Sequence, residues 1–153
     1  MSEKNGTSPM SRRAFAVRLP VLAAGASVGL ATLSLSGCAA APYLVGRPHP
    51  RGLSLRTMEL GSEGSAFVQS ADMERPIFVS RTGDGGYVAV LASCTHRGCQ
   101  PEPVGERLVC PCHGSEFSFA GAVLEGPADR PLPTYPVETD GELLVVRVEG
   151  GAR

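Results

Sequence analysis

Short runs of alternating apolar and polar residues dominate the second half of the chain. The segments "PIFVSR" and "YVAVLA" both alternate in this way, and "TGDGG" separates them. Alternation with a period of two, bounded by glycine and aspartate, is typical of β-strands joined by a turn. The pattern therefore predicts an antiparallel hairpin over residues 76–92.

A second hairpin is predicted near the C-terminus. The segments "YPVET" and "ELLVVRV" flank Asp140 and Gly141, a pair that favours a two-residue hairpin turn. Leu108 and Val109 predict the end of another short strand. Because no convincing helical periodicity follows Gly52, we predict an all-β domain built from antiparallel sheets.

Composition agrees with this pattern. The chain has 153 residues, including 19 glycines and 13 prolines, and 19% of its residues are charged. This length suits one domain with one hydrophobic core, and the glycine and proline content favours short strands with many turns. The net charge of −1 and the lack of a long basic run argue against a nucleic-acid partner.

The N-terminal region has the composition of an export signal. A polar, basic segment precedes the uncharged apolar run "LPVLAAGASVGLATLSLS" at 19–36. Arg12 and Arg13 resemble the twin-arginine signature, whose pathway exports proteins already folded and loaded with cofactor. "LSGC" resembles a bacterial lipobox, which would place lipid on Cys38. The alternative is a retained anchor helix, since about 20 apolar residues suffice to span a bilayer.

These features predict three parts. Residues 1–38 form a signal or membrane anchor, residues 39–52 form a tether rich in proline and glycine, and residues 53–153 form the folded domain. With either kind of anchor, we expect the domain on the outer, periplasmic face of a bacterial cytoplasmic membrane.

The stretch "CTHRGCQPEPVGERLVCPCHGS" at 94–115 contains four of the five cysteines and two of the three histidines. Six potential ligands lie in two groups: Cys94, His96, Cys99, Cys110, Cys112 and His113. A structural zinc site usually has ligand pairs spaced C-x2-C or H-x3-H, which differ from the C-x-H and C-x-x-H found here. Two plain disulfides are compatible with export but leave the histidines unexplained. Two thiolates and two imidazoles would suit a mixed two-iron cluster.

The motifs "CTHRGC" and "CPCHGS" resemble those of the Rieske [2Fe–2S] family, in the disulfide-bearing form found in cytochrome bc complexes. The similarity begins near residue 57 and continues to the C-terminus. It implies an antiparallel β fold with one [2Fe–2S] cluster at the tip of two loops. By position in the motifs, Cys94 and Cys110 would bind the inner iron, His96 and His113 the outer iron, and Cys99 would form a disulfide with Cys112.

The resemblance also implies roles for residues around the cluster. Ser115 matches a serine whose hydroxyl donates to a cluster sulfur, and Gly126 and Pro127 begin a proline loop that covers the cluster. Phe117 stands where these proteins usually have tyrosine. The phenolic hydrogen bond to a ligand sulfur would therefore be missing, and a lower midpoint potential of the cluster is expected. Arg97 replaces a leucine that usually lies on the quinone-docking tip.

The resemblance implies one-electron transfer at a membrane. Neutral imidazoles bring Rieske potentials to about −150 to +300 mV, against about −400 mV for plant-type ferredoxins. One version of this function is the iron–sulfur subunit of a quinol:cytochrome c oxidoreductase, with His113 nearest the quinol and a c-type cytochrome as acceptor. Another is the small subunit of an exported molybdenum oxidoreductase of the arsenite-oxidase kind. The non-redox alternative is a zinc-stabilised lipoprotein.

An oxygenase of the same superfamily is not expected. Such enzymes need a second, mononuclear iron bound by two histidines and a carboxylate. Beyond His96 and His113, only His49 remains in the chain. We therefore predict an electron-transfer subunit and not a self-sufficient enzyme.

Overall fold

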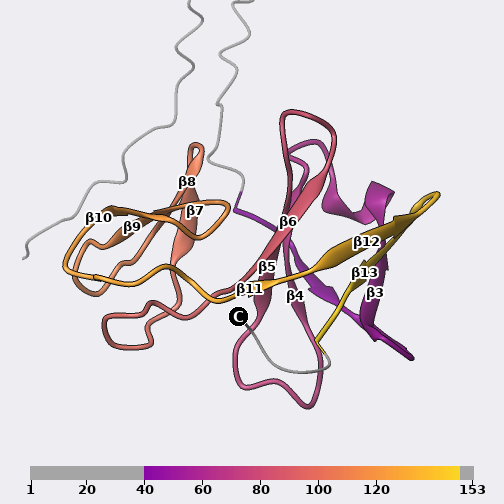
Figure 1. The fold of residues 1–153 in the computed structure, drawn as a ribbon, viewed down its shortest axis with the longest axis horizontal. Coiled ribbons are helices and arrows are strands. Elements are labelled where there is room, and N and C mark those ends of the chain that lie inside the picture. The colour runs from indigo at the N-terminus through magenta and orange to yellow at the C-terminus, as the bar shows by residue number, and fades with distance from the viewer. Residues whose placement is uncertain (1–39, 149–153) are drawn as a thin grey trace, which may run out of the picture. The chain divides into compact units, whose positions relative to one another are not determined.

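The computed structural model describes residues 40–148, in which every regular element except one 3₁₀ helix is a β-strand (Figure 1). The predicted all-β fold is confirmed. The elements are β1 (Tyr43–Val45), β2 (Arg47–His49), β3 (Gly52–Arg56), the 3₁₀ helix η1 (Thr57–Leu60), β4 (Ser65–Gln69), β5 (Ile77–Arg81), β6 (Tyr87–Leu91), β7 (Glu102–Val104), β8 (Arg107–Val109), β9 (Glu116–Ser118), β10 (Val123–Glu125), β11 (Thr134–Tyr135), β12 (Val137–Asp140) and β13 (Leu143–Val146).

The strands form three sheets. Their orders are β1-β4-β5-β6-β11, β12-β13-β3-β2 and β10-β9-β8-β7. Both predicted hairpins are confirmed, as β5–β6 and β12–β13, and Leu108 and Val109 lie in β8 as expected. In the second hairpin Gly141 has φ of +59°, a conformation that glycine adopts without steric cost.

The five-stranded sheet is buried on both faces. Side chains of one face, including Val68, Ile77 and Val79, pack with Leu55 and Leu144 of the β12-β13-β3-β2 sheet. Side chains of the opposite face join a second core: Phe67, Phe78 and Val90 pack with Leu108, Phe117 and the two unpaired cysteines Cys94 and Cys110. Because neighbouring side chains along a strand point to opposite faces, the same strands contribute to both cores.

The structure corrects the prediction that residues 42–52 are a free tether. β1 pairs in parallel with β4, and β2 pairs with β3 in antiparallel fashion. Tyr43 also stacks on Phe67, with 4.9 Å between the ring centroids. Pro48 is accommodated because β2 is an edge strand, where a missing N–H breaks no ladder.

An ion pair fastens this N-terminal segment to the rest of the domain. Both guanidinium nitrogens of Arg47 donate to the Glu59 carboxylate at 2.8 Å, and the backbone N–H of Arg56 donates to it at 2.6 Å. These hydrogen bonds from Arg47 and Arg56 lower the pKa of Glu59 to about 2. The carboxylate therefore links β2 to η1 at neutral pH.

Within residues 40–148, no helix has the length and apolar character needed to cross a membrane. The predicted anchor segment 19–36, the paired Arg12 and Arg13, and Cys38 all lie outside the described residues.

Removing residues 40–52 should destabilise the domain. A fragment that starts at residue 53 lacks β1, β2, the Tyr43–Phe67 stack and the Arg47 ion pair. We expect its Tm to be at least about 10 °C below that of a fragment that starts at residue 40. Thermal unfolding followed by circular dichroism measures this difference, and equal melting temperatures would restore the tether interpretation.

Glu59→Gln should lower the Tm at pH 7 by about 2–5 °C, because the amide loses its charged interaction with Arg47. The pKa of Glu59 is lower in the folded than in the unfolded state, so its contribution is complete above about pH 4.5 and is lost as the pH falls towards 2. The difference in Tm should shrink over that interval. Glu63→Gln is the control, since Glu63 makes no ion pair within residues 40–148. If the Tm of the E59Q variant stays equally far below that of the unmodified protein down to pH 2.5, the Glu59 carboxylate does not make this contribution.

Candidate metal centre

Two loops with the same backbone hydrogen bonds form the candidate site. In the first loop, the carbonyl of Cys94 accepts from Gly98 N–H at 2.7 Å, and Cys94 N–H donates to the Cys99 carbonyl at 2.8 Å. In the second, the carbonyl of Cys110 accepts from Gly114 N–H at 2.9 Å, and Cys110 N–H donates to the Ser115 carbonyl at 2.8 Å. Both motifs therefore close in the same way.

A glycine is required at the same position of each loop. Gly98 has φ of +75° and Gly114 has φ of +76°. Side chains with a Cβ rarely adopt this left-handed conformation. The glycines in "CTHRGC" and "CPCHGS" thus allow each loop to return to its starting cysteine.

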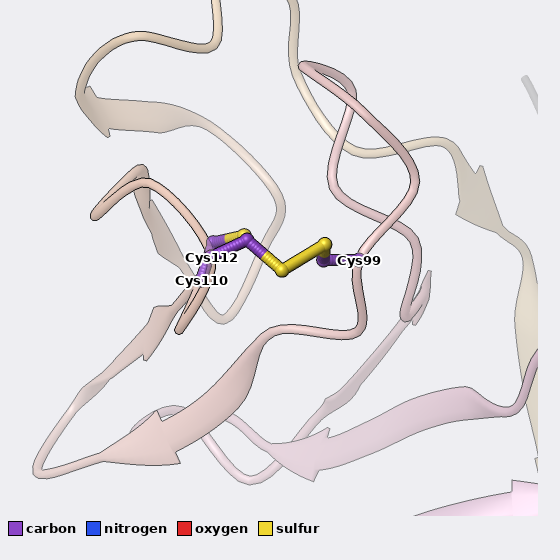
Figure 2. Close-up of side chains that lie close together, drawn as sticks. All are labelled: Cys99, Cys110 and Cys112. Atoms are coloured by element: carbon purple, nitrogen blue, oxygen red, sulfur yellow. A yellow bond between two sulfur atoms is a disulfide. The ribbon is translucent and has the colours of Figure 1, made fainter.

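A disulfide between Cys99 and Cys112 joins the two loops, as Figure 2 shows. This pairing was implied by the motifs and is confirmed. The two cysteines are 13 positions apart, and closing a loop of this size stabilises a fold by about 3 kcal/mol in the chain-entropy model. Cys110 lies beside the bridge, with its sulfur within 4.8 Å of both bridged sulfurs. Since Cys99 and Cys112 are bonded to each other, neither is available as a thiolate ligand.

Two free thiols lie on the inner side of the site. Cys94 is 3% exposed and Cys110 is 2% exposed, and both pack in the core with Phe78 and Phe117. Burial raises the pKa of the Cys110 thiol above its ordinary value. A bound cation would offset that cost by stabilising the thiolate.

Two imidazoles lie on the outer side. The rings of His96 and His113 meet edge to face, with their centroids 4.9 Å apart. His113 is exposed, whereas Nδ1 of His96 is buried and has no hydrogen-bond partner within the part of the chain that the structure describes. A buried nitrogen without a donor or acceptor is costly unless something binds it. The donor set therefore fits a metal group bound by sulfur on its inner side and by nitrogen on its outer side.

The segment that begins at Gly126 and Pro127 is fastened to both loops. Ser115 is fully buried, and its hydroxyl oxygen accepts from Ala128 N–H at 3.0 Å. On the other loop, the Thr95 hydroxyl donates to the Arg130 carbonyl at 2.6 Å. Gly126 and Pro127 themselves are exposed and are joined by a cis peptide bond. Their predicted covering role remains a prediction, whereas the attachment of this segment to the loops is observed.

Phe117 and Arg97 have contrasting environments. Phe117, in β9, is fully buried in the core that contains Cys94 and Cys110. Arg97 is exposed and lines an open hollow of about 500 Å³ beside the disulfide, together with Arg75. Phe117, at the position where a tyrosine hydroxyl was expected to be missing, therefore packs in the same core as the cysteines. Arg97, the predicted exposed cation, lies in the first cysteine loop.

Sequence reasoning did not identify several residues that support the site. Besides Thr95 and Ala128, these include Tyr43, whose hydroxyl accepts a hydrogen bond from the Gln100 side chain. Tyr43 and Gln100 are 57 positions apart. No local pattern could have associated them, because only the pairing of β1 with β4 brings them together.

Comparison with known families agrees with this site. The family model for the Rieske [2Fe-2S] domain matches residues 55–136, which is more than half of the chain. The chain belongs to the Rieske [2Fe–2S] domain family. Its cofactor is accordingly one [2Fe–2S] cluster.

Curated relatives of this Rieske chain include two proteins named as iron–sulfur subunits. The cytochrome b6-f complex iron-sulfur subunit of Synechococcus sp. (strain JA-2-3B'a(2-13)) is 47% identical over 64 residues, which are 39% of this chain and 37% of that protein. The ubiquinol-cytochrome c reductase iron-sulfur subunit of Blastochloris viridis is 41% identical over 63 residues, or 38% of this chain and 34% of that protein. In each case the matched segment spans well under half of the relative.

A solved relative matches nearly over its whole length. The cyanobacterial plasma membrane Rieske protein PetC3 from Synechocystis PCC 6803 is 38% identical, with a TM-score of 0.55. The match covers 61% of this chain and 97% of that one. The match therefore includes nearly all of that protein.

Ser115→Ala should lower the midpoint potential of the cluster and weaken the attachment of the segment at 126–132. The Ser115 oxygen already accepts from Ala128, so its proton is free to donate, and loss of a hydrogen bond to sulfur lowers a cluster potential. Redox titration measures the shift. Ser118→Ala is the matched control, since the Ser118 hydroxyl also accepts a backbone N–H, from Ala122 at 3.1 Å. Equal shifts in the two variants would refute a specific role for Ser115.

Proposed function

We propose that this protein carries one electron at a time through a Rieske cluster bound by Cys94, Cys110, His96 and His113. The observation that carries the proposal is the donor set itself. Two buried free thiols and two imidazoles that meet edge to face lie in two loops that a disulfide joins. In this arrangement the two cysteines would hold one iron of the cluster and the two histidines would hold the other. The cluster supplies the reversible one-electron change when bound.

The protein excludes water from the inner side of the site and leaves the outer side open to solvent. The thiols face an apolar core that excludes water, whereas the His113 ring reaches the surface. An imidazole that binds metal through one ring nitrogen keeps the other for a proton. If Nδ1 of His96 bound iron, its Nε2 would remain to hold a proton. Uptake of a proton and uptake of an electron would then be coupled at the outer edge of the site.

We also propose that the chain is exported in folded form and tethered to the outer face of the cytoplasmic membrane. The paired Arg12 and Arg13, the apolar run and Cys38 support this localisation. Lipid attachment at Cys38 and a retained helix would both keep the domain at the membrane. Export as a folded protein suits a domain whose cofactor is enclosed by two joined loops.

The names of the relatives and the exposed Arg97 each support a class of redox partner. Subunits named for cytochrome b6-f and ubiquinol–cytochrome c reductase complexes support a quinol-derived electron and a cytochrome acceptor. A second candidate is a redox-enzyme subunit, such as an exported molybdenum oxidoreductase, as the donor. The exposed guanidinium of Arg97 beside the cluster loops favours this candidate, because a cation at the tip suits a carboxylate-bearing protein better than an apolar quinol.

Metal and sulfide analysis tests the proposal. Protein from its native membranes should contain two irons and two acid-labile sulfides, and the reduced form should give a paramagnetic signal with the low average g of nitrogen-ligated clusters. Cys94→Ser and Cys110→Ser should lose the cluster, whereas Cys38→Ser should keep it. One zinc without sulfide would support the zinc-stabilised lipoprotein instead.

A further inference from the structure

The point at which the chain enters the domain is fixed. Ala41 is buried, and the carbonyl of Pro42 accepts from Phe67 N–H at 2.9 Å. From there, β1 and β2 hold the chain through strand pairing and through the Arg47–Glu59 ion pair. The segment between the proposed lipid site at Cys38 and the domain is therefore three residues long. Three residues span at most about 11 Å when fully extended.

Strand register places this entry point at the end of the domain opposite the cysteine loops. β1 runs parallel to β4 with Tyr43 beside Phe67, so Ala41 is level with Ser65. Through β5, that level corresponds to Val88, near the start of β6. β6 then runs to Leu91, three residues or about 10 Å further on, and the loop that contains Cys94 follows it.

The cluster-binding sheet has the same polarity. β8 runs from the turn at Gly105 and Glu106 towards Cys110. Ala41 lines one hollow together with Val104 and Gly105, at that turn. Two separate strands, β6 and β8, thus lead away from the entry point to the two halves of the cluster site (Figure 1).

Apolar side chains surround the entry point. Val104 is 52% exposed, Leu124 is 55% exposed, and these two residues line a common hollow. Phe119 lines the hollow that contains Ala41 and Val104. We call Ala41, Val104, Phe119 and Leu124 the entry face. Exposed apolar side chains close to Ala41, which itself lies at most about 11 Å from the proposed acyl-chain anchor, are suited to lipid contact.

We propose that the entry face lies against the lipid surface and that the cluster end points away from it. This inference rests on the proposed membrane tether, and within it on lipid attachment at Cys38, because an anchor that ends at residue 36 would lie further along the chain from Ala41. To turn the cluster end towards the bilayer, Ala41 would have to rise by the 10 Å of β6 and by the depth of the cysteine loop as well, which exceeds the reach of three residues. The exposed His113 therefore meets its partner on the aqueous side. The partner that fits is a protein that projects from the membrane or diffuses over it.

Tryptophan probes test the orientation, because the chain has no tryptophan of its own. Val104→Trp and Leu124→Trp place a probe on the entry face. Ala71→Trp is the matched control, an exposed site between β4 and β5, at the opposite end of β5 from the turn to β6. Full-length, cluster-loaded variants are reconstituted into phosphatidylcholine vesicles with and without brominated acyl chains. Their visible spectra verify that the cluster is intact.

We expect brominated lipid to at least halve the tryptophan fluorescence of the Val104 and Leu124 variants, because bromine quenches only on close approach. The fluorescence of the Ala71 variant should stay within about a tenth of its value in unbrominated vesicles. Protein that floats with the vesicles but shows equal quenching at all sites, or most quenching at position 71, would overturn the orientation and leave the tether intact. Protein that fails to float with vesicles would overturn the tether and the orientation with it.

Discussion

The site depends on the junction of two equivalent loops. Each loop closes through a hydrogen bond from a left-handed glycine to the first cysteine, and the Cys99–Cys112 disulfide fixes one loop against the other. Each loop is closed by its own backbone hydrogen bonds, and the disulfide joins the two loops that carry the two thiols and the two imidazoles. A flexible pair of loops with the same disulfide would not preorganise four donors.

The two loops carry different side chains at one equivalent position. Arg97 and His113 both stand three positions after the first cysteine of their loops. One loop thus presents the His113 imidazole where the other presents the Arg97 guanidinium to solvent. The cation beside the cysteines therefore occupies the position in its loop that the imidazole occupies in the other.

The five-stranded sheet connects this site to the rest of the domain. One face packs against the β12-β13-β3-β2 sheet and the other packs with the cysteines, so the same strands support both cores. The N-terminal strands add to this scaffold where a flexible tether was expected. Their incorporation shortens the free connection to the proposed anchor, which limits how far the cluster can travel.

The sequence by itself determined the β class, both hairpins, the Cys99–Cys112 pairing and the membership of the Rieske family. These features are carried by local signals: period-two alternation, an Asp-Gly turn, and cysteines spaced within two short motifs. Only the tertiary structure decided that residues 43–45 and 47–49 pair as strands, that Tyr43 reaches Gln100, and that Ser115 holds Ala128. Whether a segment pairs as a strand depends on the partner strand, which for β1 lies far away in the chain. A short run rich in proline and glycine has no periodic pattern from which that partner could be inferred.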